Sequence, residues 1–103
     1  MTESEILTLL LEKPGLYIGY GSVIRAFSFI EGYTFAMQRP TDLVYREFGQ
    51  WLRKNFDIRQ DLSWASIIYF VGQSEKGAFD LAKEMWPQYL KEVQSSLEND
   101  DRP

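Results

Sequence analysis

The clearest structural pattern in the chain is the stretch Leu43-Val44-Tyr45-Arg46-Glu47-Phe48-Gly49-Gln50-Trp51-Leu52-Arg53-Lys54-Asn55-Phe56. Its large apolar side chains recur at helical spacing on one side, while most of its charged and amide groups lie on the other. Thr41 or Asp42 can cap the first turn. The stretch therefore predicts a helix that packs through one face, which is made of Val44, Phe48, Trp51, Leu52 and Phe56.

Two helices are expected before this stretch. One begins after Ser22, a capping residue, and stops before Pro40, which cannot continue a helix. Gly32 lowers the stability of that helix, so we expect a close neighbour there. A leucine-rich helix over residues 3–12 comes first and ends at a Pro14-Gly15 turn. The core face predicted for the helix after Ser22 consists of Val23, Ala26, Phe27, Ile30, Tyr33 and Met37.

The segment from Trp64 to Val71 has two interpretations. It is rich in strand-forming residues, but its apolar residues also make a helical stripe that Asp61 or Ser63 can cap. We favour a helix here and keep a strand as the alternative.

A last helix is expected from Ser74 onward. Pro87 removes one backbone hydrogen bond and clashes with the carbonyl of Lys83, so we expect a kink near Trp86 or two helices end to end. Residues 98–103 are expected to fray. The whole chain, residues 1–103, is predicted to form one all-α, compact domain of about five helices. The predicted core side of the last helix consists of Ala78, Leu81, Ala82, Met85, Tyr89, Leu90 and Val93.

The composition favours binding over catalysis. The chain contains no His and no Cys, yet 16% of its residues are aromatic. His and Cys supply most acid–base chemistry near neutral pH and most zinc ligation, so we expect no enzyme activity, no metal and no cofactor. A hydrolase that uses paired carboxylates remains as a minor alternative, because only Asp and Glu could perform such chemistry.

The charge indicates a protein partner. The net charge is −4, and the carboxylates concentrate at the two ends of the sequence. An acidic surface repels phosphate backbones and attracts basic proteins, so direct nucleic-acid binding is not expected. The apolar run Ile6–Leu11 is too short to cross a bilayer, and the acidic N-terminus is unlike a secretory signal. We therefore expect a cytoplasmic protein that does not contact membranes.

Five short motifs follow one another along the chain. They are Pro14-Gly15-Leu16-Tyr17-Ile18-Gly19, Phe29-Ile30-Glu31-Gly32-Tyr33, Phe48-Gly49-Gln50-Trp51-Leu52, Ser63-Trp64-Ala65-Ser66-Ile67-Ile68 and Ala78-Phe79. In order and spacing they resemble a family of small bacterial proteins that includes immunity proteins of contact-dependent growth inhibition systems. The resemblance implies a protein that neutralises a cognate toxin domain, of a basic, RNase A-like ribonuclease type, by occluding its nucleic-acid-binding active site.

The expected toxin contacts combine carboxylates with exposed aromatic side chains, because aromatic anchors supply binding energy and charges steer the encounter. They are placed on the outer side of the last helix, with support from two residues elsewhere. We expect the free protein to be a monomer. The alternative function is a regulatory adaptor or a homodimeric interaction protein. The predicted contacts are Glu31, Tyr69, Asp80, Glu84, Trp86 and Glu92.

Overall fold

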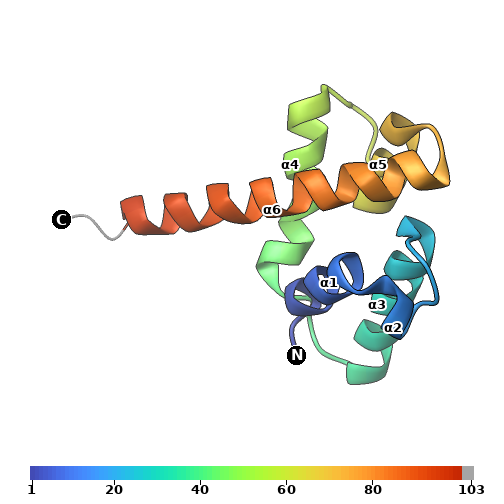
Figure 1. Cartoon of the computed structure of the whole chain (residues 1–103). Helices are drawn as coiled ribbons and strands as arrows, with labels where there is room; N and C mark the ends of the chain where they lie inside the picture. Colours follow the sequence, from blue (N-terminus) through green and yellow to red (C-terminus); the bar gives the residue numbers. More distant parts are fainter. Residues whose placement is uncertain (101–103) are drawn as a thin grey trace.

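The computed structural model of the chain describes residues 1–100, and every regular element in that range is an α-helix (Figure 1). This confirms the predicted all-α class. The structure contains one helix more than predicted, a single turn at the expected Pro-Gly turn. Pro14 lies in the first turn of this helix, where its missing N–H is not needed. In chain order the helices are α1 (Glu3–Glu12), α2 (Pro14–Tyr17), α3 (Val23–Met37), α4 (Leu43–Phe56), α5 (Trp64–Gly72) and α6 (Glu75–Asp100).

Helix α6 holds the molecule together. It contacts α1, α3, α4 and α5, and Figure 1 shows it crossing α4 with α1, α2 and α3 gathered below it. Its C-terminal part extends beyond the other helices, so the molecule measures 47 × 32 × 24 Å (Figure 1). Within residues 1–100, no helix combines the length and the apolar character needed to cross a bilayer.

Side-chain caps fix where the middle helices begin. Ser22, Asp42 and Ser63 each accept a hydrogen bond from the backbone N–H three residues later, at the starts of α3, α4 and α5. The cap of α4 is thus Asp42 and not Thr41, and the cap of α5 is Ser63 and not Asp61. Such caps stabilise a helix by about 1 kcal/mol each. The segment that could have been a strand is therefore a capped helix, α5.

The core is built around aromatic side chains. Trp86 is 1% exposed, its ring centroid lies 4.9 Å from that of Phe48, and its indole N–H donates to the Thr8 hydroxyl at 2.9 Å. The indole N–H of Trp64 donates to the Tyr45 hydroxyl at 2.7 Å. Both indoles therefore place a large apolar ring in the core with the polar N–H satisfied.

The expected break at Pro87 is not observed. Helix α6 continues through Pro87 as one element, and Figure 1 shows no interruption in its ribbon. Both Pro87 and Lys83 are exposed, so water can bind the Lys83 carbonyl that lost its helical partner. Fraying was expected from residue 98, but the helix continues to Asp100. The rest of the predicted frayed tail, residues 101–103, lies outside the described part of the chain.

A close backbone contact was expected at Gly32, but the structure has such contacts at Gly72 and Gly77 instead. A Cβ at Gly72 would lie 2.5 Å from the backbone nitrogen of Ala78, and Gly77 is equally crowded, so α5 and α6 meet too closely for side chains. A Cβ at Gly32 would meet nothing within 4 Å. The expected close neighbour of Gly32 is therefore absent from the described residues.

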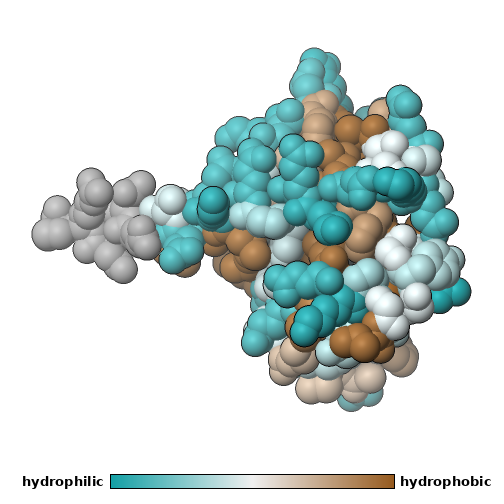
Figure 2. Space-filling model, viewed as in Figure 1, coloured by the Kyte–Doolittle hydropathy of each residue, from teal (hydrophilic) through white to brown (hydrophobic). Residues whose placement is uncertain are grey.

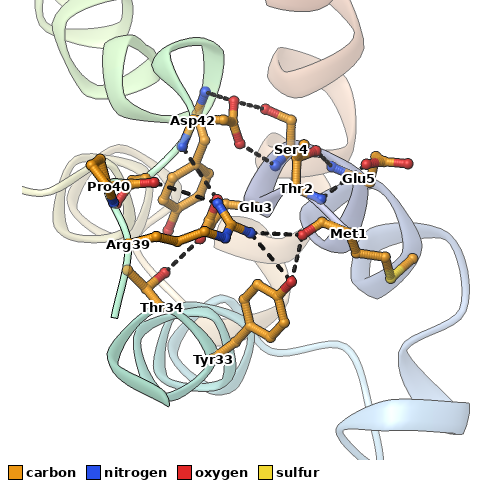
Figure 3. Close-up of polar contacts among 12 residues, drawn as sticks. Met1, Thr2, Glu3, Ser4, Glu5, Tyr33, Thr34, Arg39, Pro40 and Asp42 are labelled. Carbon is orange, nitrogen blue, oxygen red and sulfur yellow. Dashed lines mark hydrogen bonds and ion pairs between the residues drawn. The ribbon is translucent and has the colours of Figure 1, made fainter. Parts of the chain in front are cut away.

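A polar cluster, which we call the Glu3 cluster, buries the first turn of α1 against the segment between α3 and α4 (Figure 3). The Glu3 side chain is fully buried. Its carboxylate accepts hydrogen bonds from the Thr34 hydroxyl at 3.0 Å and the Asp42 N–H at 3.2 Å, and Arg39 lies 3.5 Å away. The charge is therefore compensated inside the fold.

Asp42 continues this cluster toward α1. Its carboxylate accepts from the Ser4 N–H at 2.9 Å and the Ser4 hydroxyl at 2.7 Å, besides capping α4 through the Tyr45 N–H. Partial burial acts to raise the pKa of Asp42, but these hydrogen bonds outweigh burial and hold the pKa below its usual value. This arrangement could not be predicted from local sequence patterns, because its members are up to 39 residues apart.

Candidate functional site

The predicted contacts on the N-terminal half of α6 lie on a surface of mixed charge. Asp80 and Glu84 are exposed, and the Asp80 carboxylate pairs with Lys76 at 3.2 Å. Residues 75–91 hold three carboxylates and three lysines, so this half of α6 has no net charge. Figure 2 shows the outer side of α6 as largely hydrophilic. These two residues are accessible, but they do not form an acidic patch.

The prediction for Trp86 places it on the wrong side of the helix. Trp86 belongs to the core and not to the outer side of α6. It follows Ala82 by four residues and precedes Tyr89 by three, and both of these are also buried, so all three share one face. This spacing could have placed Trp86 in the core from the sequence. Instead the core stripe was drawn through Met85, which is only partly buried.

Glu92 lies on the part of α6 that extends beyond the other helices. Residues 92–103 hold four carboxylates and one arginine, and so account for −3 of the net charge of −4. The apolar side of this part continues the core stripe, with Leu90 and Val93 partly buried and Leu97 61% exposed. The acidic character of the chain is therefore concentrated at this end of the molecule, which we call the α6 extension (residues 92–100).

Glu31 and Tyr69 line two adjoining hollows, which we together call the α3–α5 groove. The hollows measure about 280 and 350 Å³ and share Phe27 and Ser63 as walls. Tyr69 lines the mainly apolar hollow together with Ile24. Glu31 lines the other, which has more of its wall from α4 than from α5. The two predicted contacts therefore lie in neighbouring hollows and not on the outer side of α6.

The segment between α4 and α5 forms part of the wall of the hollow that Glu31 lines. Arg53 donates to the carbonyls of Ile58 and Arg59 and lies 3.7 Å from the Asp61 carboxylate. This arginine therefore positions the segment between α4 and α5. Glu31 has no ion-pair partner among residues 1–97, so it is free to meet a cation from outside.

Two buried tyrosines of the core have raised pKa values. Burial raises the pKa of Tyr45, and burial together with the nearby Glu47 and Asp42 carboxylates raises the pKa of Tyr89 to about 12. Both phenols stay neutral at physiological pH and serve as core hydrogen-bonding groups. Among the described residues, no group of three Asp, Glu, His or Cys side chains could hold a metal ion.

Sequence reasoning missed one surface, which we call the outer face of α3. Its large members are Ile24, Phe29 and Phe35, which are 55%, 42% and 83% exposed. Its small members are Ser28, Gly32 and Ala36, which are also exposed. Met37, which was expected in the core, lies on the inner side of α3 but is 48% exposed because it is the last residue of the helix. The signal was present in the sequence: α3 has apolar residues on all sides, which is typical of a helix with neighbours on more than one face.

Comparison of the chain with family models, with curated proteins and with solved structures finds no match. Its functional assignment therefore depends on its own residues and surfaces.

Proposed function

We propose that this protein is a cytoplasmic immunity protein that binds and neutralises a cognate toxin domain. The toxin is a basic, RNase A-like ribonuclease of a contact-dependent growth inhibition system, and the protein acts by covering the toxin's nucleic-acid-binding active site. It performs no chemistry of its own. The five sequence motifs described above lead to this family, and the charge distribution of the chain is the structural observation that supports it.

The α6 extension supports the proposal because of its charge and its position. Nuclease active sites carry positive charge to hold phosphates, and a segment rich in carboxylates fits such a cleft. Most of the net negative charge lies at this end, whereas residues 75–91 are neutral. Opposite charges accelerate association and orient the two proteins as they meet. Glu92 is therefore the strongest of the predicted contacts.

The α3–α5 groove supports the proposal in a different way. Its apolar hollow beside Tyr69 can receive an apolar side chain of the partner, and Glu31 in the adjoining hollow can pair with a lysine or arginine. A concave surface with an aromatic wall and a free carboxylate is suited to holding a protein once it has been attracted.

The proposal is tested with the basic protein encoded beside this chain. Purified immunity protein should inhibit the nuclease activity of that neighbour and protect cells that produce it. If the neighbour is neither bound nor inhibited, and cells are not protected, the proposed function is wrong.

A matched pair of charge reversals locates the contact. Glu92→Lys should slow association with the toxin by about tenfold at low salt, since electrostatic steering contributes factors of this size and more. Glu84→Lys makes the same change of charge on the neutral part of α6 and should alter the association rate much less. Equal effects of the two reversals would move the contact away from the α6 extension.

A further inference from the structure

The outer face of α3 exposes more apolar surface than one folded chain can account for. Phe35 is 83% exposed, and Ile24 and Phe29 are 55% and 42% exposed. They lie on one helix, and no described part of the chain covers them. A contiguous exposed apolar patch of this kind marks a binding surface.

Gly32 lies in the middle of this face and has no role inside the monomer. Glycine weakens a helix interior relative to alanine, and other glycines of this chain compensate for it by allowing close packing. Gly72 and Gly77 do so at the junction of α5 and α6. A Cβ on Gly32 would meet nothing within 4 Å, so its benefit must come from a backbone outside the described chain.

The occupant that fits this face is the same face of a second copy. Consider two copies of α3 that run antiparallel and are related by a two-fold axis that passes beside Gly32. Large residues of one copy then lie opposite small residues of the other. Phe35 lies about 4.5 Å along the helix from Gly32, and Ser28 lies about 6 Å from it in the other direction, at 1.5 Å per residue. The two-fold axis therefore places Phe35 of one copy over Ser28 of the other. By the same arithmetic Phe29 packs over Ala36 of the second copy.

We propose that the protein forms a two-fold symmetric homodimer through the outer face of α3, with Gly32 at the point of closest approach. This goes beyond the proposed function and does not rest on it. The three large side chains offer roughly 300 Å² of apolar area per copy, and the small residues between them and the polar rim supply the rest of the ~1,200 Å² of a small specific interface.

The charges beside this face argue against a basic toxin as its occupant. Arg25 donates to the Ile18 carbonyl at 2.7 Å and lies 4.5 Å from the centre of the Tyr20 ring. Glu31 lines the α3–α5 groove. Arg25 lies seven residues before Gly32 on the same side of α3, so its positive charge would repel a cationic protein. In the symmetric pair it lies about 10.5 Å along the helix from the two-fold axis, so the two copies of Arg25 are about 21 Å apart and do not meet.

Sedimentation of the full chain over a range of concentrations tests the dimer. The unaltered protein should form a dimer, and Gly32→Leu should raise its dissociation constant roughly tenfold to a hundredfold because a side chain would separate the helices. The monomer should fold as well as before, since leucine favours a helix and has open space at this position. Phe70→Ser, which changes a 74% exposed residue of α5, is the control and should leave the dimer intact.

Cysteine cross-linking tests the geometry directly, because the chain contains no cysteine. Under mild oxidation, Gly32→Cys should give a disulfide-linked dimer, since the two-fold axis brings its two copies together. Phe70→Cys should stay monomeric. A chain that is monomeric at every concentration, or a dimer that Gly32→Leu leaves intact, overturns the proposal. Loss of toxin binding in Gly32→Leu with no dimer in the unaltered protein would assign the face to the toxin instead.

Discussion

Thr34 and Phe35 are neighbours on α3 that face opposite environments. The Thr34 hydroxyl donates to the fully buried Glu3 carboxylate, inside a cluster in which each buried polar atom has a partner. Phe35 is 83% exposed on the outer face of the same helix. One side of α3 therefore buries charge, and the other exposes hydrocarbon.

The difference shows where each unfavourable feature is compensated. A buried carboxylate is expensive unless hydrogen bonds and an ion pair replace its water, and the Glu3 cluster supplies both within the chain. An exposed phenylalanine gains nothing from the fold that carries it. The Glu3 cluster should therefore contribute to the stability of the monomer, while the outer face of α3 should contribute to association only.

The largest effect is expected from the centre of the cluster. Glu3→Ala should lower the free energy of unfolding by about 3 kcal/mol, because the Asp42 N–H, the Thr34 hydroxyl and Arg39 all lose their acceptor. Urea unfolding measures this change. Glu12→Ala, at the exposed end of α1, is the matched control and should change stability by less than about 0.5 kcal/mol. Similar losses in both variants would mean that the cluster is not a special contributor.

Asp42 comes next, because it joins the cluster to the start of α4. Asp42→Ala should cost about 2 kcal/mol through the lost cap and the lost bonds to Ser4. The pKa of Asp42 is lower in the folded chain than in the unfolded chain, so its contribution is complete above the unfolded value of about 3.9 and disappears as pH falls through the folded value. Asp42→Asn should lack that part of the acid sensitivity. An unaltered slope of stability against pH would contradict this.

A change of the opposite sign is expected on the outer face. Gly32→Ala should stabilise the monomer by about 0.8 kcal/mol, because alanine favours a helix and its Cβ meets nothing within 4 Å. Thermal unfolding at a concentration too low for association measures it. The same substitution at Gly72 should destabilise the protein, since a Cβ there would lie 2.5 Å from a backbone nitrogen.

The smallest effect is expected from the most exposed aromatic ring. Phe35→Ser should change the stability of the monomer by less than about 0.5 kcal/mol in dilute solution. Phe48→Ser, which empties a fully buried position of α4, should cost several times more. A large loss for Phe35→Ser would show that the ring contributes to the fold, and the contrast between the two sides of α3 would fail.

The helices could be predicted from the sequence because their starts obey local rules. Ser22, Asp42 and Ser63 each act on an N–H three residues away, and such a signal can be recognised without knowing the rest of the fold. Trp64 to Val71 was ambiguous by composition, but its cap and its helical stripe gave the right answer.

The sites could not be placed in the same way because they depend on distant contacts. Glu3 reads as an ordinary surface acid until residues more than 30 positions away close over it. Trp86 is the exception, because its spacing from Ala82 and Tyr89 indicates a core position. Only its partners Phe48 and Thr8 are distant in the sequence. Glu31 and Tyr69 come from different helices, and only the packing of α3 against α4 and α5 places them in adjoining hollows.

The place of α6 in the chain has a consequence for biosynthesis. Trp86 and Tyr89, on this helix, complete the aromatic core around Phe48. A ribosome makes the other five helices first, so the growing chain holds Phe48 and the inner faces of α1 and α5 without their cover until α6 has emerged from the exit tunnel. Completion of this core is therefore a late step in the folding of these six helices, because it waits for the last of them to be made.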